Sequence, residues 1–243
     1  MKKIIIANWK MNLGLNDSLK LTWALKDLKS SHEVVLCPSE FALPLLAQIL
    51  TKSAVKLGAQ NVFWAERGAH TGETDAKSLK EIGCAYVILG HSERRALGES
   101  CRQVNSKIKA VLASGLTPVV CVGEAWDKYK AGKGKIFVAG QLKRALSGIK
   151  LADKKLIIAY EPIWAIGSGK PMMAKEADNM QLFIKQTAKR ALKQARADIK
   201  VVYGGSVDAG NAKSFLQEDN IDGLLVGGAS LKAPEFKKIA NIK

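Results

Sequence analysis

The chain has 243 residues, of which 47% are hydrophobic and 25% are charged, an ordinary composition for a globular protein. Its formal net charge is +16, and a field of this sign attracts anionic substrates or, less specifically, nucleic acid. Aromatic and basic residues do not alternate as they do in single-strand binders. No apolar run approaches a membrane span, and the run ending at Ala7 is too short for a signal peptide. We therefore expect a partner that is neither nucleic acid nor membrane.

Cysteine and histidine are sparse, which argues against a metal centre. None of the four cysteines has CxxC spacing with another, and the chain has three histidines. We expect no metal site and no disulfide framework. Buried cysteines of this kind are typical of a reducing compartment, so the chain is predicted to be cytoplasmic.

Short apolar segments recur along the whole chain and predict eight strands. The segments are residues 4–7, 34–37, 55–59, 86–89, 118–122, 156–160, 199–203 and 223–226. Most are apolar throughout, as strands buried on both faces should be. Helical patterns are found at residues 18–28, 41–50, 75–82, 100–113, 136–146, 175–197, 211–217 and 234–239.

Strict alternation of strands and helices predicts a parallel sheet. A closed eight-stranded barrel takes about 250 residues. We therefore predict that residues 1–243 form a single α/β domain, a (β/α)8 barrel. A doubly wound open sheet is the alternative, but no GxGxxG turn follows the first strand.

A barrel of this class carries its active site at the carboxyl ends of the strands. The stretch from Tyr160 to Lys170 follows the sixth strand and contains Glu161, Trp164, Ile166 and two glycines. Apolar side chains on a loop are useful as a lid that expels water from a ligand, and Glu161 at its foot could act as a base. Taken alone, the stretch is better interpreted as a surface turn with a capping glutamate and a tryptophan packed on a neighbour.

Other polar residues follow other strands and converge on the same end of the predicted barrel. Asn8 and Lys10 follow the first strand, and His91 and Glu93 follow the fourth. Glycine-rich turns at 167–169, 204–206 and 227–228 could bind phosphate through clustered backbone N–H groups. A glutamate, a histidine and a lysine beside a phosphate site suggest proton abstraction next to a carbonyl, with stabilisation of the oxyanion.

These segments resemble the triosephosphate isomerase family, in the order of the chain from residue 8 to residue 231. The matching segments are 8–12, 58–62, 70–73, 89–95, 121–124, 160–170, 203–207 and 225–231. The resemblance implies interconversion of dihydroxyacetone phosphate and glyceraldehyde 3-phosphate, without metal or cofactor. This reaction belongs to glycolysis and gluconeogenesis.

The resemblance also implies the catalytic roles. Glu161 would be the base that moves a proton between neighbouring carbons, and His91 a neutral acid that polarises the carbonyl. Lys10 and Asn8 would stabilise the oxygen that becomes negative, and Glu93 would link Lys10 to His91.

Substrate binding is implied for a second set of residues. Backbone N–H groups would hold the phosphate, and two apolar side chains would dry Glu161 when the lid closes. The N–H groups belong to Gly167, Ser206, Gly227 and Gly228, and the apolar side chains are Ile166 and Leu225.

Members of this family are homodimers, which implies that the chain pairs with a second copy of itself. The loop from Asn61 to Asp75 would enter the partner subunit, with Thr71 at its tip. Another phosphate-binding barrel, such as a sugar-phosphate epimerase or an anthranilate-pathway isomerase, is the alternative function. A catalytically silent barrel and a basic nucleic-acid-binding protein are further alternatives.

Overall fold

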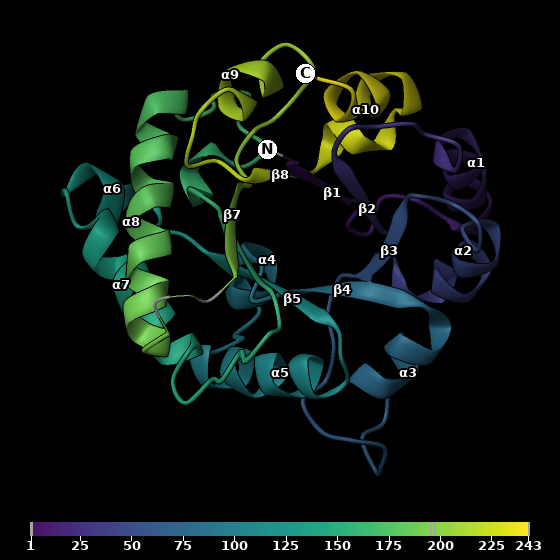
Figure 1. Cartoon of the computed structure of the whole chain (residues 1–243), viewed down its shortest axis with the longest axis horizontal. Coiled ribbons are helices and arrows are strands. Elements are labelled where there is room, and N and C mark those ends of the chain that lie inside the picture. Colours follow the sequence, from purple (N-terminus) through teal and green to yellow (C-terminus); the bar gives the residue numbers. More distant parts are fainter. Residues whose placement is uncertain (1, 195, 197, 243) are drawn as a thin grey trace.

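Eight parallel strands close into one barrel in the order of the chain (Figure 1). The structure is a computed structural model that describes residues 2–194, 196 and 198–242. The strands are β1 Ile4–Asn8, β2 Glu33–Cys37, β3 Lys56–Ala59, β4 Cys84–Leu89, β5 Thr117–Val122, β6 Leu156–Tyr160, β7 Ile199–Tyr203 and β8 Gly223–Val226. The predicted (β/α)8 barrel is confirmed.

The barrel closes where β1 pairs with both β2 and β8. Ile4 is in register with Glu33 on one side and with Gly223 on the other. A Cβ atom on Gly223 would lie only 1.9 Å from the carbonyl oxygen of Ile4. A side chain at this position would therefore push β8 away from β1, so the seam depends on glycine.

Helices surround the barrel on the outside (Figure 1). The α-helices are α1 Leu15–Leu25, α2 Leu43–Ile49, α3 Ala76–Ile82, α4 Ser92–Ala96, α5 Cys101–Ala113, α6 Trp126–Lys130, α7 Gly134–Ala145, α8 Ala174–Leu192, α9 Ala212–Leu216 and α10 Ala233–Ala240. Three 3₁₀ helices, η1 Glu40–Ala42, η2 Ile163–Ala165 and η3 Gly228–Leu231, lie in connections. Within the described part of the chain, no helix is both long and apolar enough to cross a bilayer.

Every predicted strand is present, and most deviations concern helix boundaries. The predicted helix 18–28 is displaced to Leu15–Leu25, and the predicted helix 41–50 is divided into η1 and α2. Pro44 explains the division, because proline fits the first turn of a new helix and not a helix interior. Helices α4 and α6 were not predicted, since five residues are too few to show a helical period.

The predicted helix 175–197 is longer than the observed helix and includes two positions that the structure does not describe. Residues 195 and 197 lie outside the described residues, and α8 ends at Leu192. Lys193 follows in the left-handed conformation, with φ of 54°, which a helix cannot continue.

The core has two parts, because successive strand residues point to opposite faces. Ile4 and Ile6 belong to the cluster inside the barrel, together with residues such as Val119. Ile5 and Ala7 belong to the larger cluster between the strands and the outer helices. Both faces of each strand are buried, which is why the strands are apolar throughout. This packing fixes the strand ends, and the strand ends position the polar residues described next.

Candidate active site

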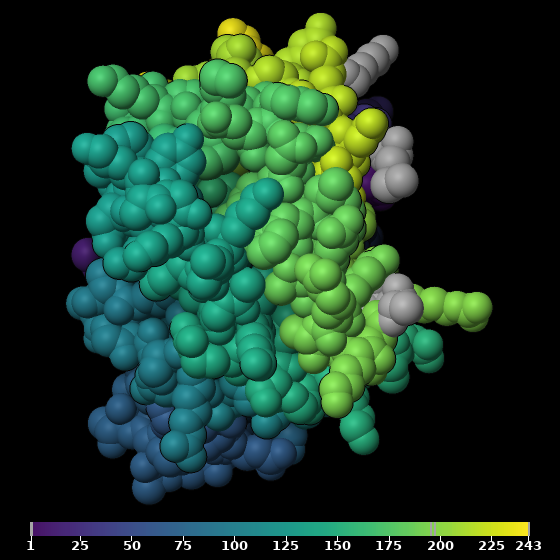
Figure 2. Space-filling model, turned by 90° about the vertical axis from the view of Figure 1, so that its left-hand side faces the viewer, coloured from purple at the N-terminus to yellow at the C-terminus, as the bar shows by residue number. Residues whose placement is uncertain are grey.

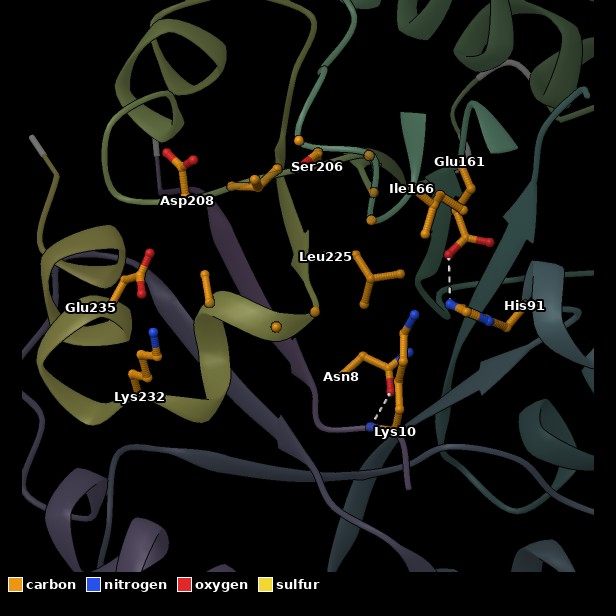
Figure 3. A pocket seen from close by; sticks show the side chains of 18 residues that line it. Asn8, Lys10, His91, Glu161, Ile166, Ser206, Asp208, Leu225, Lys232 and Glu235 are labelled. Carbon is orange, nitrogen blue, oxygen red and sulfur yellow. Dashed lines mark hydrogen bonds and ion pairs between the residues drawn. The ribbon is translucent and has the colours of Figure 1, made fainter. Parts of the chain in front are cut away.

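Loops at the carboxyl ends of five strands surround a cavity of about 370 Å³. Of the predicted site residues, all except Glu93 line it: Asn8, Lys10, His91, Glu161, Ile166, Gly167, Ser206, Leu225, Gly227 and Gly228. In Figure 3, Glu161, His91, Lys10 and Asn8 gather at one end, away from Asp208, Lys232 and Glu235. Barrel closure thus brings together side chains from segments far apart in the sequence.

Glu161 is held directly after β6 by backbone hydrogen bonding to β5. Its N–H donates to the carbonyl of Val122 at 2.8 Å, and Gly123 lets the backbone segments that follow β5 and β6 approach closely. The carboxylate is 2% exposed. One oxygen lies 3.0 Å from His91 Nε2, and the other accepts the N–H of Ser92 at 3.1 Å. In this resting geometry, the candidate base contacts the candidate acid.

His91 lies two residues after the end of β4 and caps the first turn of α4. Its Nδ1 accepts the N–H of Glu93 at 3.2 Å, which leaves Nε2 to carry the proton toward Glu161. Burial lowers the pKa of His91, but the carboxylates of Glu161 and Glu93 raise it by more, so the net shift is upward. The upward direction of the pKa shift reflects the contact of the ring with Glu161, while the N–H of Glu93 directed at Nδ1 fits a ring that is unprotonated at that nitrogen.

Replacing Glu161 with Gln should lower the pKa of His91, because the largest raising interaction is lost while burial remains. An NMR titration of the imidazole resonances would measure this shift. Glu81→Gln is the matched control, since that carboxylate pairs with Arg67 on the surface. If the pKa of His91 were the same in Glu161→Gln and in the unaltered chain, the proposed coupling would be wrong.

Lys10 has an uncommon backbone conformation for a residue other than glycine, with φ of 51°. Its N–H donates to Asn8 Oδ1 at 3.1 Å, and its carbonyl accepts from Gln60 Nε2 at 2.8 Å and Ser39 Oγ at 3.0 Å. These three bonds offset the strain and aim the side chain into the cavity (Figure 3). Lys10 Nζ lies 2.6 Å from Glu93 Oε1, so Glu93 reaches the cavity through Lys10.

The loop of residues 162–172, here called the lid, is attached at both ends. At its start, the indole N–H of Trp164 donates to Glu124 Oε1 at 3.3 Å. At its end, the N–H of Met172 donates to the hydroxyl of Tyr203 at 3.0 Å. Residues 167–171 between them are exposed, and Ser168 Oγ bonds only within the lid, to the carbonyls of Ala165 and Lys170. The tip of the lid is therefore exposed to solvent in this structure.

The other end of the cavity is built mainly from backbone. Gly204, Gly205 and Ser206 follow β7, and Gly227 and Gly228 lead from β8 into η3. A Cβ atom on Gly205 would lie 2.2 Å from the hydroxyl of Tyr203, so only glycine fits there. Short turns of this kind direct N–H groups toward an anion.

Comparison with known proteins agrees with this geometry. The family model described as triosephosphate isomerase matches residues 3–243. Proteins named triosephosphate isomerase are 46% identical in Dehalococcoides mccartyi, over 98% of this chain and 96% of the relative, and 43% identical in a Thermoanaerobacter species, over 99% of both chains. The Aquifex aeolicus protein of that name is 40% identical over 98% of both chains. The chain belongs to the triosephosphate isomerase family.

In this member of the triosephosphate isomerase family, sequence reasoning missed part of the cavity wall. Asp208, Lys232 and Glu235 line the cavity beyond the glycine-rich turns, and Gln60 and Ser39 hold Lys10 in place. Position after a strand was a usable signal for Asp208, Gln60 and Ser39, which follow β7, β3 and β2. Lys232 and Glu235 lie around the start of α10, where the sequence shows no polar pattern that marks them. The contribution of Ser92 comes from its backbone N–H, which no side-chain signal could reveal.

Proposed function

We propose that this protein interconverts dihydroxyacetone phosphate and D-glyceraldehyde 3-phosphate. The observation that supports the proposal is that the two ends of the cavity differ. Glu161 and His91 are in contact at one end, and glycine-rich backbone turns form the other. A three-carbon phosphate fits this arrangement, with its carbonyl toward His91 and its phosphate toward Gly205, Gly227 and Gly228. Family membership supports the same assignment.

In the proposed reaction, Glu161 takes a proton from the carbon next to the carbonyl. The bonding electrons form the carbon–carbon double bond of an enediolate, and the carbonyl oxygen becomes negative. His91 gives this oxygen the Nε2 proton and recovers a proton from the neighbouring hydroxyl. Glu161 then returns its proton to the former carbonyl carbon, so that no atom is gained or lost.

The remaining polar residues act on charge and position. Lys10 places a positive charge near the developing oxyanion, and Asn8 holds the Lys10 backbone and can hydrogen-bond beside the substrate. Glu93 orients Lys10 through the contact of 2.6 Å. Substrate that displaces Glu161 from His91 removes the main interaction that raises the pKa of His91, and so favours the neutral imidazole that acts as the acid in this proposal.

Lid closure completes the site in this proposal. The N–H groups of Gly167, Ser206, Gly227 and Gly228 hold the phosphate dianion, and only Gly167 belongs to the lid. Ile166 and Leu225 line the cavity near Glu161 (Figure 3) and exclude water from it once the lid is shut. Exclusion of water also protects the enediolate from losing phosphate.

A direct assay tests the proposal. The purified chain should convert glyceraldehyde 3-phosphate to dihydroxyacetone phosphate and catalyse the reverse reaction, with no metal or cofactor added. Pentulose phosphates and phosphoribosyl anthranilate would be assayed in parallel, because they represent the other phosphate-binding barrel isomerases and epimerases. Turnover of one of these in place of the triose phosphates would overturn the assignment.

We infer that residues 1–243 form a single barrel domain that pairs with a second copy. The loop of residues 61–75 projects below the helices in Figure 1 and is braced internally by the Phe63 ring, 4.1 Å from Trp64 and 4.7 Å from His70. A second cavity of about 350 Å³ lies on the other side of Lys10 and contains Met11 and Leu97, whose side chains are 93% and 81% exposed. The tip of a partner loop at Thr71 would cover these apolar residues and support Lys10.

Replacing Leu97 with Glu should shift the protein from dimer to monomer, because it places a charge in the proposed interface. Sedimentation velocity at several protein concentrations would measure the shift. Ile136→Glu is the matched control, since Ile136 is 76% exposed on α7, outside the second cavity. A Leu97→Glu variant that sediments like the control would contradict this interface.

A further inference from the structure

Three aromatic rings meet where the lid begins. Tyr129 lies 4.5 Å from Trp164 between ring centroids, and Trp126 lies 5.5 Å from both Trp164 and Tyr129. Trp126 and Tyr129 come from α6, whereas Trp164 belongs to η2 at the start of the lid. Figure 2 shows this face, where the teal segments that include α6 and α7 lie beside the green of α8. The lid is thus packed against a helix that takes no part in the proposed chemistry.

The geometry of α6 explains why both of its rings reach the lid. Trp126 and Tyr129 are three residues apart, so they project from the same side of this single-turn helix. The helix starts two residues after Glu124, a buried carboxylate that accepts from both Trp164 and the hydroxyl of Tyr160 at 3.0 Å. The Tyr129 ring, tilted by 37°, and the Trp126 ring, edge-on at 64°, therefore pack against an indole whose N–H is already bonded to Glu124.

Two observations indicate that this packing holds the start of the lid while its tip stays exposed. Residues 167–171 are exposed, and the hydrogen bonds of Ser168 stay within the lid. Trp126 is 53% exposed, so burial of its own surface does not account for its position. Its contact with Trp164 orders a large aromatic side chain of α6 at the surface, against the start of the lid.

We propose that Tyr129 and Trp126 are positioning residues that clamp Trp164 and hold the lid open until substrate binds. This inference rests on the proposed function, because it requires a substrate that draws the lid shut. For a ligand that needs the closed lid, the apparent Kd is the intrinsic Kd divided by the fraction of molecules whose lid is closed. The clamp lowers that fraction, so it weakens ground-state binding and speeds product release.

Weakening the clamp should therefore lower KM. We expect Tyr129→Leu and Trp126→Ala each to lower KM for glyceraldehyde 3-phosphate by about threefold, the effect of losing one aromatic pair. Inorganic phosphate, which uses the same N–H groups, should inhibit at a correspondingly lower concentration. If reopening of the lid limits turnover, kcat falls with KM.

Two controls separate the clamp from general damage. Tyr129→Phe keeps the ring and removes only the hydroxyl, 3.5 Å from Glu176, so KM should return to the value of the unaltered chain. Trp23→Ala removes a tryptophan of similar exposure, 56%, from α1 and should leave KM unchanged. A purely structural role for Tyr129 would lower stability and raise KM, which is the opposite sign.

The outcomes distinguish the clamp from the proposed function. If the unaltered chain converts triose phosphates while KM and phosphate inhibition are unchanged or weaker in both clamp variants, the clamp is wrong and the function stands. If the unaltered chain has no isomerase activity, the proposed function fails. Phosphate binding, monitored through the change in tryptophan emission, would still report whether the clamp opposes lid closure.

Discussion

Replacing Glu161 with Gln should lower kcat by about 10²–10⁴-fold or more, because the substitution removes the general base. The side chain is 3% exposed and packed against His91 and Ser92, so Gln keeps the shape of the site. A steady-state assay in both directions would measure the loss. KM should change much less than kcat, since Glu161 does not contact the phosphate in the proposed complex.

Two checks accompany this experiment. Thermal unfolding should show that Glu161→Gln folds like the unaltered chain, so that a loss of kcat is not a loss of protein. Glu93→Gln should have a smaller effect, because Glu93 acts through Lys10 and its carboxylate is 57% exposed. Activity of Glu161→Gln within about threefold of the unaltered chain would refute the proposed base, since a lost general base costs far more.

Replacing Gly123 with Ala should disrupt the site through the backbone. A Cβ atom on residue 123 would lie 1.7 Å from the carbonyl oxygen of Glu161 and 2.6 Å from its carbonyl carbon, so the end of β6 must move away from β5. We expect a fall in kcat of about 10²-fold, which a misplacement of about 1 Å produces. Overpacking of this kind also lowers the free energy of unfolding by about 1–3 kcal/mol.

Gly14→Ala is the matched control for this substitution. Its backbone has φ of −71°, and no atom lies within 4 Å of an added Cβ, so both kcat and stability should be retained. Kinetics and denaturant unfolding of the two variants would be compared side by side. If Gly123→Ala kept the kcat of Gly14→Ala, the position of Glu161 would not depend on close approach of β5 and β6.

Much of the fold could be read from local patterns. Each apolar segment predicted as a strand forms one, because strands buried on both faces have an unbroken apolar signal. Helix ends were harder to place, as the division at Pro44 and the single-turn helices α4 and α6 show. These features depend on one residue or one turn, which is shorter than the window over which periodicity can be measured.

The candidate site was predictable to the extent that it depends on position after a strand. Asn8, Lys10, His91 and Glu161 line one cavity because parallel strands in a barrel end at the same face. The contacts of the supporting groups were not predictable in the same way, although Gln60 directly follows β3. Gln60 reaches Lys10 across 50 positions of sequence, and Ser92 reaches Glu161 across 69.

The sequence by itself determined the strands, the order of polar residues at their ends and the glycine-rich turns, because each is a local property of the chain. Only the tertiary structure decided that Glu161 rests on His91 and that Lys10 takes a left-handed backbone. It also decided that the rings of α6 hold Trp164. Contacts of this kind depend on how strand register and helix packing place distant segments to within an ångström, and no local pattern carries that information.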